Sequence, residues 1–403
     1  MTTRTASSRT GAASAAAWII LAVLLLFSIA APLNQFKVPP IMPLLMDALG
    51  LSVSGAGLLM SVYAVTGLIL ALPAGFILQR VGFRVTGLIA GGSIVLGGIL
   101  GALSQSTGSL LASRVIEGAG TSFMAVLAPA LIAQWFAASK RGTAMGIWSA
   151  WVPLGTAATL IVAPPLAQAA GWRAVWWLGV IYALVVTVLY LVVARPAPQV
   201  AGADGIQAPA EAPRVTSRDV LRNRNIWLLS VAFAAFNAAA IASGTYLPTF
   251  LSTQRGIPLA QAALLAAIPT LITIFSAPGG GILSDRIGSR KKPYLIGFAA
   301  AALLLPLNVI ASGFALIAVL VAGGLALGLV PTAIFSGAVE AAGDPRQGGL
   351  AMAIIQVGQN AGMLIGPVVV GALAQSAGWT AAFASLAVMA LIGFAAGLLA
   401  RVR

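Results

Sequence analysis

The sequence predicts an all-α membrane protein with twelve transmembrane helices, arranged as two pseudo-symmetric six-helix bundles. Three observations support this fold class: the composition, the spacing of apolar runs and an internal repeat. Hydrophobic residues make up 60% of the 403 residues and charged residues only 7%. Soluble domains contain about 25% charged residues, so most of this surface must face a bilayer rather than water.

Apolar runs recur along the whole chain, each near the roughly 20 residues that cross a hydrocarbon core. The first run follows Arg4 and Arg9 and looks like a secretory signal, but a matching run in the second half argues that it is retained. The predicted spans are residues 16–46, 54–78, 85–104, 109–136, 143–168, 174–194, 226–251, 259–283, 294–312, 314–338, 348–374 and 379–400.

The repeat divides the chain into two halves. Residues 75–84 return as residues 281–290, an offset of 206, and residues 167–172 return as 374–379, an offset of 207. Two separate stretches that agree within one residue indicate a duplication.

The repeat and the composition together predict the domain organisation. A segment rich in Ala and Pro, without a spanning pattern, separates the two blocks of six spans and is expected to be a cytoplasmic linker. The domains are a cytoplasmic N-terminal tail, the first bundle, the linker, the second bundle and a short C-terminal tail, at residues 1–15, 16–194, 195–225, 226–400 and 401–403.

The formal charge of +14 would suggest a nucleic-acid partner in a soluble protein. With both termini inside, however, eighteen Lys and Arg residues fall on the cytoplasmic side and only Arg173 and Arg255 fall outside. This asymmetry is typical of a multi-pass protein of a bacterial inner membrane or a plasma membrane. The expected partners are therefore the lipid bilayer and a small molecule, not nucleic acid, and we expect a monomer.

The chain contains no Cys and no His. Thiol and imidazole chemistry and most zinc sites are therefore excluded, and we expect no metal site and no cofactor. A membrane-embedded enzyme would need a nucleophile with a base or a metal cluster, for which little remains. We do not expect an enzyme.

Three charged side chains lie inside the predicted spans and away from their ends: Lys37, Arg114 and Glu117. Each must face a cavity or a partner. Arg114 and Glu117 share a helical face, as do Asn34 and Lys37 just before the Val-Pro-Pro sequence that breaks the first span and frees backbone carbonyls. Two structural alternatives stay open: Lys37 could snorkel to the interface, and Arg114 and Glu117 could form a purely structural ion pair.

In the functional interpretation these charges form a substrate site. Lys37 and Arg114 would attract an anion, and Glu117, which is the only carboxylate well inside a span, would carry a proton. Their net charge is then +1 with Glu117 ionised and +2 with Glu117 protonated, which favours a small carboxylate or an inorganic oxyanion. Further candidates for substrate binding are polar or aromatic groups inside spans: Asn34, Tyr63, Trp151, Asn237, Gln356 and Gln359. Two Gly-x-x-x-Gly pairs in the third span are expected to be close-packing faces without a ligand.

The repeated loops have a physical interpretation of their own. Gly75 and Gly281 would let neighbouring backbones approach, and Gly82 and Gly288 would permit a tight turn. The basic residues would anchor the turn at the cytoplasmic face: Arg80, Arg84, Arg286 and Arg290.

These loops resemble the signature loop of the major facilitator superfamily, and residues 110–120 resemble the second motif of that family. The resemblance implies a substrate site near the bilayer midplane and rocking between inward-open and outward-open states. It also implies a gating latch, in which the acidic residue of the loop meets a helix N-terminus of the other half. Asp285 fits, with the helix start near Thr143 as partner. Gln79 does not, so we expect a bias toward the inward-open state.

Weaker similarities concern the branch of the family. Residues 135–146 are similar to a loop of nitrate/nitrite and organic-anion porters, and Lys37 before a proline pair is similar to cyanate permeases. Residues 362–367 resemble an exporter motif but lie in the eleventh span rather than the fifth. The expected function is secondary transport of a small anion by alternating access, coupled to proton symport. A proton-driven drug or metabolite exporter and a solute sensor without net transport remain alternatives.

Overall fold

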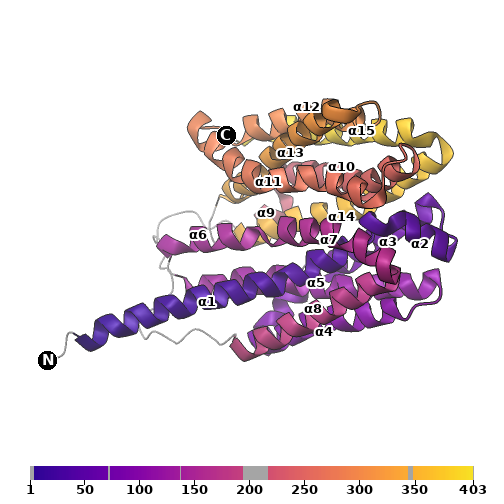
Figure 1. Ribbon diagram of the computed structural model, residues 1–403. Coiled ribbons are helices and arrows are strands. Elements are labelled where there is room, and N and C mark those ends of the chain that lie inside the picture. Colours follow the sequence, from indigo (N-terminus) through magenta and orange to yellow (C-terminus); the bar gives the residue numbers. More distant parts are fainter. Residues whose placement is uncertain (1–3, 71–72, 137, 194–216, 344–347, 403) are drawn as a thin grey trace.

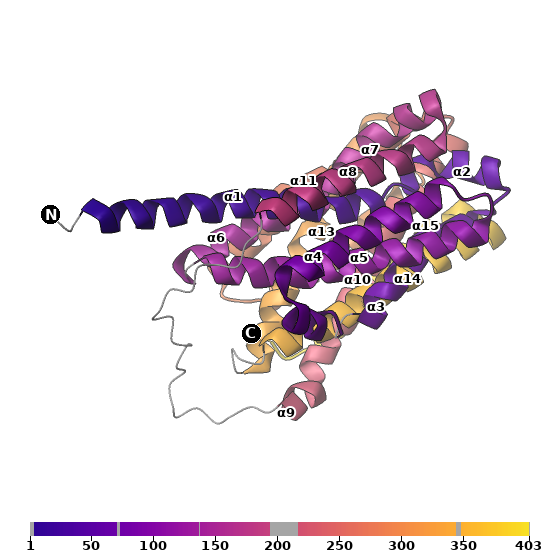
Figure 2. The same cartoon turned by 90° about the horizontal axis from the view of Figure 1, so that it is seen from below.

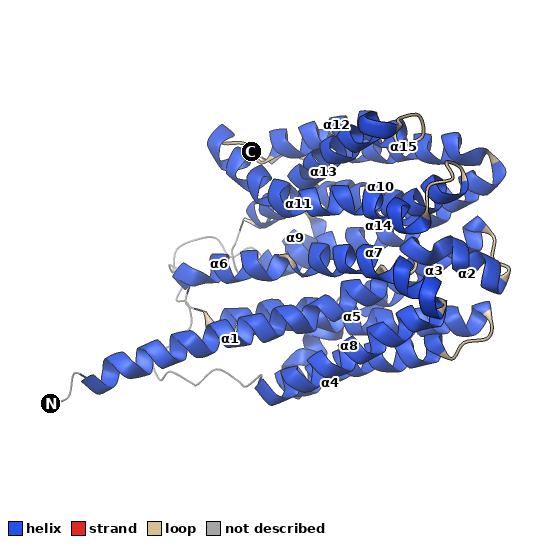
Figure 3. Cartoon of the chain, in the orientation of Figure 1, coloured by secondary structure: helices blue, strands red, loops and turns tan. Residues whose placement is uncertain are grey.

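The computed structural model describes residues 4–70, 73–136, 138–193, 217–343 and 348–402, and for some of these the backbone alone. Figure 3 shows that this described part consists of helices joined by short loops. The helices of the first half are α1 (Arg4–Gln35), the 3-10 helix η1 (Pro39–Ile41), α2 (Met42–Leu49), α3 (Val53–Leu70), α4 (Pro73–Ala102), α5 (Thr107–Trp135), α6 (Ala138–Ser149), α7 (Trp151–Ala170) and α8 (Trp172–Val193).

The second half follows the same order. Its helices are α9 (Ser217–Arg222), α10 (Arg224–Thr253), α11 (Leu259–Ile287), α12 (Lys291–Leu307), α13 (Gly313–Ala342), α14 (Gly348–Ser376) and α15 (Gly378–Leu399). Within the described residues, eleven helical segments are long and apolar enough to cross a membrane. The ninth predicted span corresponds to α12, which is shorter at 17 residues. The fold class of the sequence analysis is confirmed.

Four predicted spans differ from single helices. The first is broken between α1 and η1, where Pro39 and Pro40 follow the break, and the fifth is broken at Ala150 between α6 and α7. The second and third spans share the helix α4, which is kinked at Gly82 with φ of 76° and ψ of 176°. The positive φ at Gly82 is a conformation that favours glycine.

The two halves lie side by side, with the first half in indigo to magenta and the second in orange to yellow (Figure 1). The halves pack through α3 against α14 and through α7 against α11, and η1 contacts α10 and α11. Across the halves, the Tyr246 hydroxyl of α10 donates to the Val53 carbonyl of α3 at 3.4 Å. Figures 1 and 2 also show that α1 begins and α15 ends toward the same end of the molecule.

The duplication predicted from the sequence is visible in the packing. A Cβ added to Gly118 of α5 would lie 2.2 Å from the Tyr63 carbonyl oxygen, and one added to Gly324 of α13 would lie 2.7 Å from the Pro269 carbonyl oxygen. Both pairs are related by the same offset as the repeated loops. Equivalent helices therefore cross at equivalent residues in the two halves.

The glycine pairs of α4 bring other helices close, as predicted. A Cβ at Gly97 would lie 2.7 Å from the Cγ of Glu117, and one at Gly101 would lie 2.2 Å from the indole nitrogen of Trp176. Glycine at these two positions leaves the room in which the charged side chains of the first half lie.

Candidate functional site: a buried charge triad and two repeated loops

The site begins with the break in the first span. Pro39 has no backbone N–H, so the carbonyl of Gln35, four residues earlier, has no helical partner. Arg114 of α5 supplies one: its Nη2 donates to the Gln35 carbonyl at 2.6 Å, and its Nη1 donates to the Asn34 carbonyl at 2.7 Å. The Nε of Arg114 donates to the Leu59 carbonyl of α3 at 3.1 Å. Arg114 therefore ties the end of α1 to α3 and α5.

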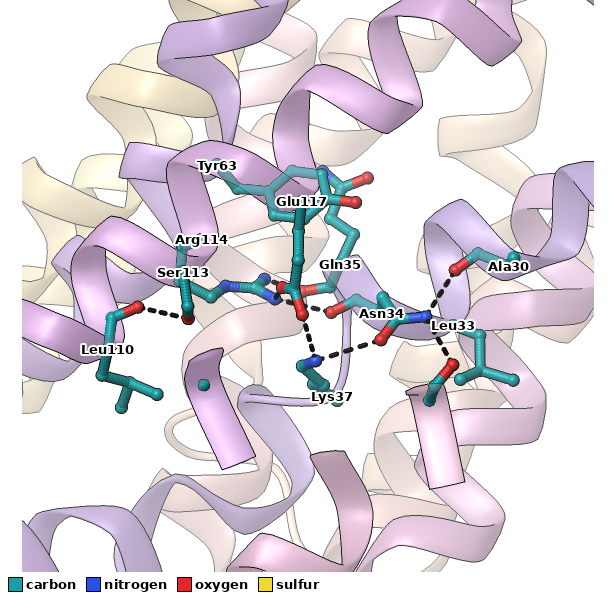
Figure 4. A network of polar contacts seen from close by, with 12 residues as sticks. Ala30, Leu33, Asn34, Gln35, Lys37, Tyr63, Leu110, Ser113, Arg114 and Glu117 are labelled. Atoms are coloured by element: carbon teal, nitrogen blue, oxygen red, sulfur yellow. Dashed lines mark hydrogen bonds and ion pairs between the residues drawn. The ribbon is translucent and has the colours of Figure 1, made fainter. Parts of the chain in front are cut away.

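Glu117 joins two fully buried cations, Lys37 and Arg114 (Figure 4). Its Oε1 lies 2.5 Å from the Nζ of Lys37, and its Oε2 pairs with the Nη1 of Arg114. All three side chains are fully buried. The three charged residues singled out in the sequence analysis thus lie together, and we refer to Lys37, Arg114 and Glu117 as the charge triad.

Lys37 lies in the turn between α1 and η1 and does not snorkel. Its Nζ donates to the Oδ1 of Asn34 at 3.0 Å and lies 4.5 Å from the ring centroid of Trp176 in α8. The Asn34 amide in turn donates to its own helix at Ala30 and, at 3.4 Å, to the Gly179 carbonyl of α8. Lys37 also lines a pocket of about 180 Å³ between α1, α7 and α8.

Tyr63 of α3 completes the surroundings of Arg114. The guanidinium carbon of Arg114 lies 4.5 Å from the Tyr63 ring centroid, and the Tyr63 hydroxyl is 2.6 Å from the hydroxyl of Thr121. A guanidinium over an aromatic face is attracted by the ring quadrupole. Arg114 thus has five partners, namely three backbone carbonyls, Glu117 and the Tyr63 ring. Among the described residues, Lys37 has three: Glu117, Asn34 and the Trp176 ring.

The electrostatics of the triad follow from its count of charges. Two cations share one carboxylate, so the triad has a net charge of +1 while Glu117 is ionised. A buried charge without a counter-charge is costly, because burial removes its hydration. The arrangement can therefore stabilise an added anion next to Lys37.

The structure does not bring the other predicted candidates to the triad. Trp151 stacks on Trp148 with ring centroids 5.4 Å apart, and Asn237 donates to the Phe233 carbonyl of its own helix. Gln356 and Gln359 are half-buried on α14. In the described part of the chain no hydrogen bond joins these four candidates to the triad, and no three Asp, Glu, His or Cys side chains come together there.

Trp176, Thr121 and Gly179 contact the site but were not among the predicted residues. The spacing of Thr121 from Arg114 on α5 was visible in the sequence. For Trp176 and Gly179 the sequence offered only their place in an apolar span, because contacts between α8 and α1 depend on tertiary packing.

The repeated loops hold their turns with glycine. Gly82 and Gly288 have φ of 76° and 64°. A Cβ at Gly75 would meet nothing within 4 Å, so the prediction that Gly75 allows a close backbone approach is wrong. The side chain of Asp285 and that of Gly281 lie outside the described residues, and Arg286 is exposed.

The basic residues of the loops have different partners in the two halves. Arg84 donates to the Leu191 carbonyl of α8 at 2.9 Å. Its equivalent, Arg290, forms a salt bridge with Glu340 of α13 at 3.0 Å and donates to the Ser284 hydroxyl. The sequence analysis did not identify Glu340 as a partner, because it lies on another helix, far from the loop along the chain.

Several relatives have names that give an anion as the substrate. The chain is 24% identical over 377 residues to the hexuronate transporter of Bacillus subtilis, covering 87% of this chain and 88% of the relative. It is 27% identical over 288 residues to a probable sulfoacetate transporter of Cupriavidus necator, covering 68% and 66%. It is 25% identical over 237 residues to a nitrite extrusion protein of Bacillus subtilis, covering 59% and 58%.

The fold also matches a solved structure. A bacterial homologue of the human lysosomal transporter Spinster superposes with a TM-score of 0.77 at 16% identity, covering 95% of this chain and 96% of that one. The family model described as Major Facilitator Superfamily matches residues 24–348 and 256–403. With its twelve spans, its repeated loops and these matches, the chain belongs to the major facilitator superfamily of membrane transporters.

Proposed function

We propose that this transporter moves a small anionic solute, an organic carboxylate or an inorganic oxyanion, by alternating access. The observation that carries the proposal is the excess positive charge of the triad. Lys37 and Arg114 are fully buried and have one carboxylate between them. An anion bound beside Lys37 would supply the missing negative charge.

The geometry also suggests how the anion binds. Each oxygen of Glu117 meets one cation, which is the arrangement that an incoming carboxylate or oxyanion would reproduce. Arg114 is held by three backbone carbonyls and stays in place. We therefore assign substrate contact to both Lys37 and Arg114, with Asn34 as the neighbour of Lys37.

Proton coupling is a separate part of the proposal. An anion that binds alone beside Lys37 would neutralise the triad. In a symport step the anion would instead take the place of the Glu117 carboxylate between the two cations, and Glu117 would carry a proton, so that the site keeps the net charge of +1 that it has without substrate. Anion and proton would enter together, as in a symporter. The names of the relatives support the substrate class, because hexuronate, sulfoacetate and nitrite are all anions.

We also propose the orientation and the working parts. The charge asymmetry supports cytoplasmic termini in a bacterial inner membrane. Residues 16–194 and 226–400 would rock about their shared seams, with residues 195–225 as the linker. Trp151, Asn237, Gln356 and Gln359 remain candidate residues of the path, and Gly75, Gln79, Arg80, Gly281, Asp285 and Arg286 remain candidate residues of the gating loops.

The test is binding and uptake by purified protein. Thermal shift against galacturonate, sulfoacetate, nitrate and nitrite from pH 5.5 to 8 identifies a ligand, and uptake of that ligand into proteoliposomes is then measured with and without a proton gradient. We expect Lys37→Met to weaken binding at least 10-fold, about 1.4 kcal/mol. Arg218→Gln on α9 removes one exposed positive charge outside the spans and should leave binding unchanged.

Three outcomes would contradict the proposal. Anion binding retained in Lys37→Met would remove the site assignment. Binding without accumulation would indicate a solute sensor. Proton-driven export of lipophilic cations, unaffected by the Lys37 substitution, would indicate a drug exporter instead.

A further inference from the structure

We propose that the first-half loop carries a binding site for an anionic phospholipid, with the lipid phosphate on Arg80 and an acyl chain along Phe76. The site is a groove of about 410 Å³ at the start of α4, lined by Pro73, Phe76, Ile77, Gln79 and Arg80. Four of these residues are exposed. No role in substrate binding is assigned to this groove.

The groove has one apolar and one basic end. Phe76 is 66% exposed, which suits contact with hydrocarbon rather than with water. Arg80 follows four residues later and so lies on the same face of the helix. In the described part of the chain Arg80 forms no ion pair or hydrogen bond. A phospholipid matches this order, because its apolar acyl chain lies below its charged phosphate.

The charge distribution of the first half calls for an external anion. Residues 1–194 contain only two carboxylates, Asp47 and Glu117. Asp47 lies on α2, at the opposite end of the second span from the groove, and Glu117 is buried in the triad. The basic residues of this face, Arg80 and Arg84 among them, have no carboxylate of their own half to pair with.

The second half shows what the first half lacks. There Arg290 is paired with Glu340, and the loop carries Asp285 next to Arg286. By the offset of the repeated loops, the first-half equivalents of the two acids are Gln79 and Gln134. Both acids are thus replaced by a neutral amide side chain. The cytoplasmic leaflet is rich in anionic lipids, which attract exposed Arg side chains by about 1 kcal/mol each, so a lipid can supply the charge that these glutamines do not.

The experiment compares lipids and the two loops. Protein is reconstituted in nanodiscs of phosphatidylcholine alone or with increasing fractions of phosphatidylglycerol, and bound lipid is counted by native mass spectrometry after release. We expect one retained phosphatidylglycerol per chain, and at least a fivefold loss of that species in Arg80→Gln. The matched control Arg286→Gln should lose less than twofold, because its loop has its own acid.

Further variants keep the proposal testable if Arg80→Gln folds poorly. Gln79→Asp adds an acid beside Arg80 and should also lower retention at least fivefold, whereas Arg80→Lys should restore part of it. Equal retention in wild type, Arg80→Gln and Gln79→Asp would overturn the proposal. The proposal would also be overturned if glycerol 3-phosphate or inorganic phosphate stabilised the protein in detergent as much as phosphatidylglycerol does. This result would indicate a site for free phosphate rather than for a lipid.

Discussion

The two halves of this transporter share one fold but carry different charges at equivalent positions. By the offset of the repeated loops, Arg114 and Glu117 of α5 correspond to Leu320 and Gly323 of α13, both buried. At the predicted cytoplasmic face the difference is reversed. There the second half pairs Arg290 with Glu340, while the first half has glutamine in place of the acid.

The comparison teaches that a duplicated helix pair can keep its packing while its chemistry changes. Gly118 and Gly324 make the same crossing against Tyr63 and Pro269. One turn away from this crossing the first half has a buried salt bridge, whereas the second half has Leu320 and Gly323, which cannot form one. Packing is preserved because the backbone approach depends on glycine, whereas the neighbouring side chains are free to take either role.

The largest effect on stability is expected when Arg114 is replaced by leucine, which is the residue at the equivalent position of the second half. Arg114→Leu would remove one of the two cations that pair with Glu117 and leave three backbone carbonyls without their donor. A buried acceptor without a partner costs about 1–3 kcal/mol, so with three such carbonyls we expect a loss of at least about 3 kcal/mol in thermal or chemical unfolding. The matched change Leu320→Met in α13 should cost less than about 1.5 kcal/mol. Equal costs in the two halves would mean that the triad has no structural role.

A second variant tests whether Glu117 carries the proton. Glu117→Gln keeps the shape of the side chain but cannot titrate, so uptake should lose its dependence on pH and on the proton gradient. Exchange of labelled for unlabelled substrate across the membrane should continue, because that reaction needs no net proton movement. The measurement is uptake and exchange by the same proteoliposomes between pH 5.5 and 8. Gradient-driven accumulation that persists in Glu117→Gln would exclude this residue as the proton carrier.

The smallest expected effect is at the loops. The double variant Gln79→Asp, Gln134→Glu gives the first half the acidic pattern of the second, and a new exposed ion pair is worth about 0.2–1 kcal/mol. If the acid acts as a latch, the cytoplasmic side should close more often. Because the chain has no cysteine, Gln359→Cys provides a single site for an impermeant maleimide added from outside. Labelling should become faster in the double variant, and an unchanged rate would contradict the latch.

Part of the site was predictable because it follows from local rules. The spacing of Arg114 and Glu117 placed them on one helical face, and free carbonyls were expected where Pro39 interrupts the first span. The partners of Lys37 were harder to predict. Asn34 is close in sequence, but Trp176 comes from α8, at the far end of the first half, and only the packing of α8 on α1 brings the ring under the ammonium.

The sequence by itself determined the membrane environment, the twelve spans and the two halves, because composition, run length and repeat do not depend on how helices pack. It also determined which charges are inside the membrane. Only the tertiary structure decided that Lys37 is buried rather than snorkelling, that it shares Glu117 with Arg114, and that Arg290 meets Glu340 while Arg84 meets a carbonyl oxygen. These contacts join residues on different helices, and their geometry depends on interhelical crossings that no single segment encodes.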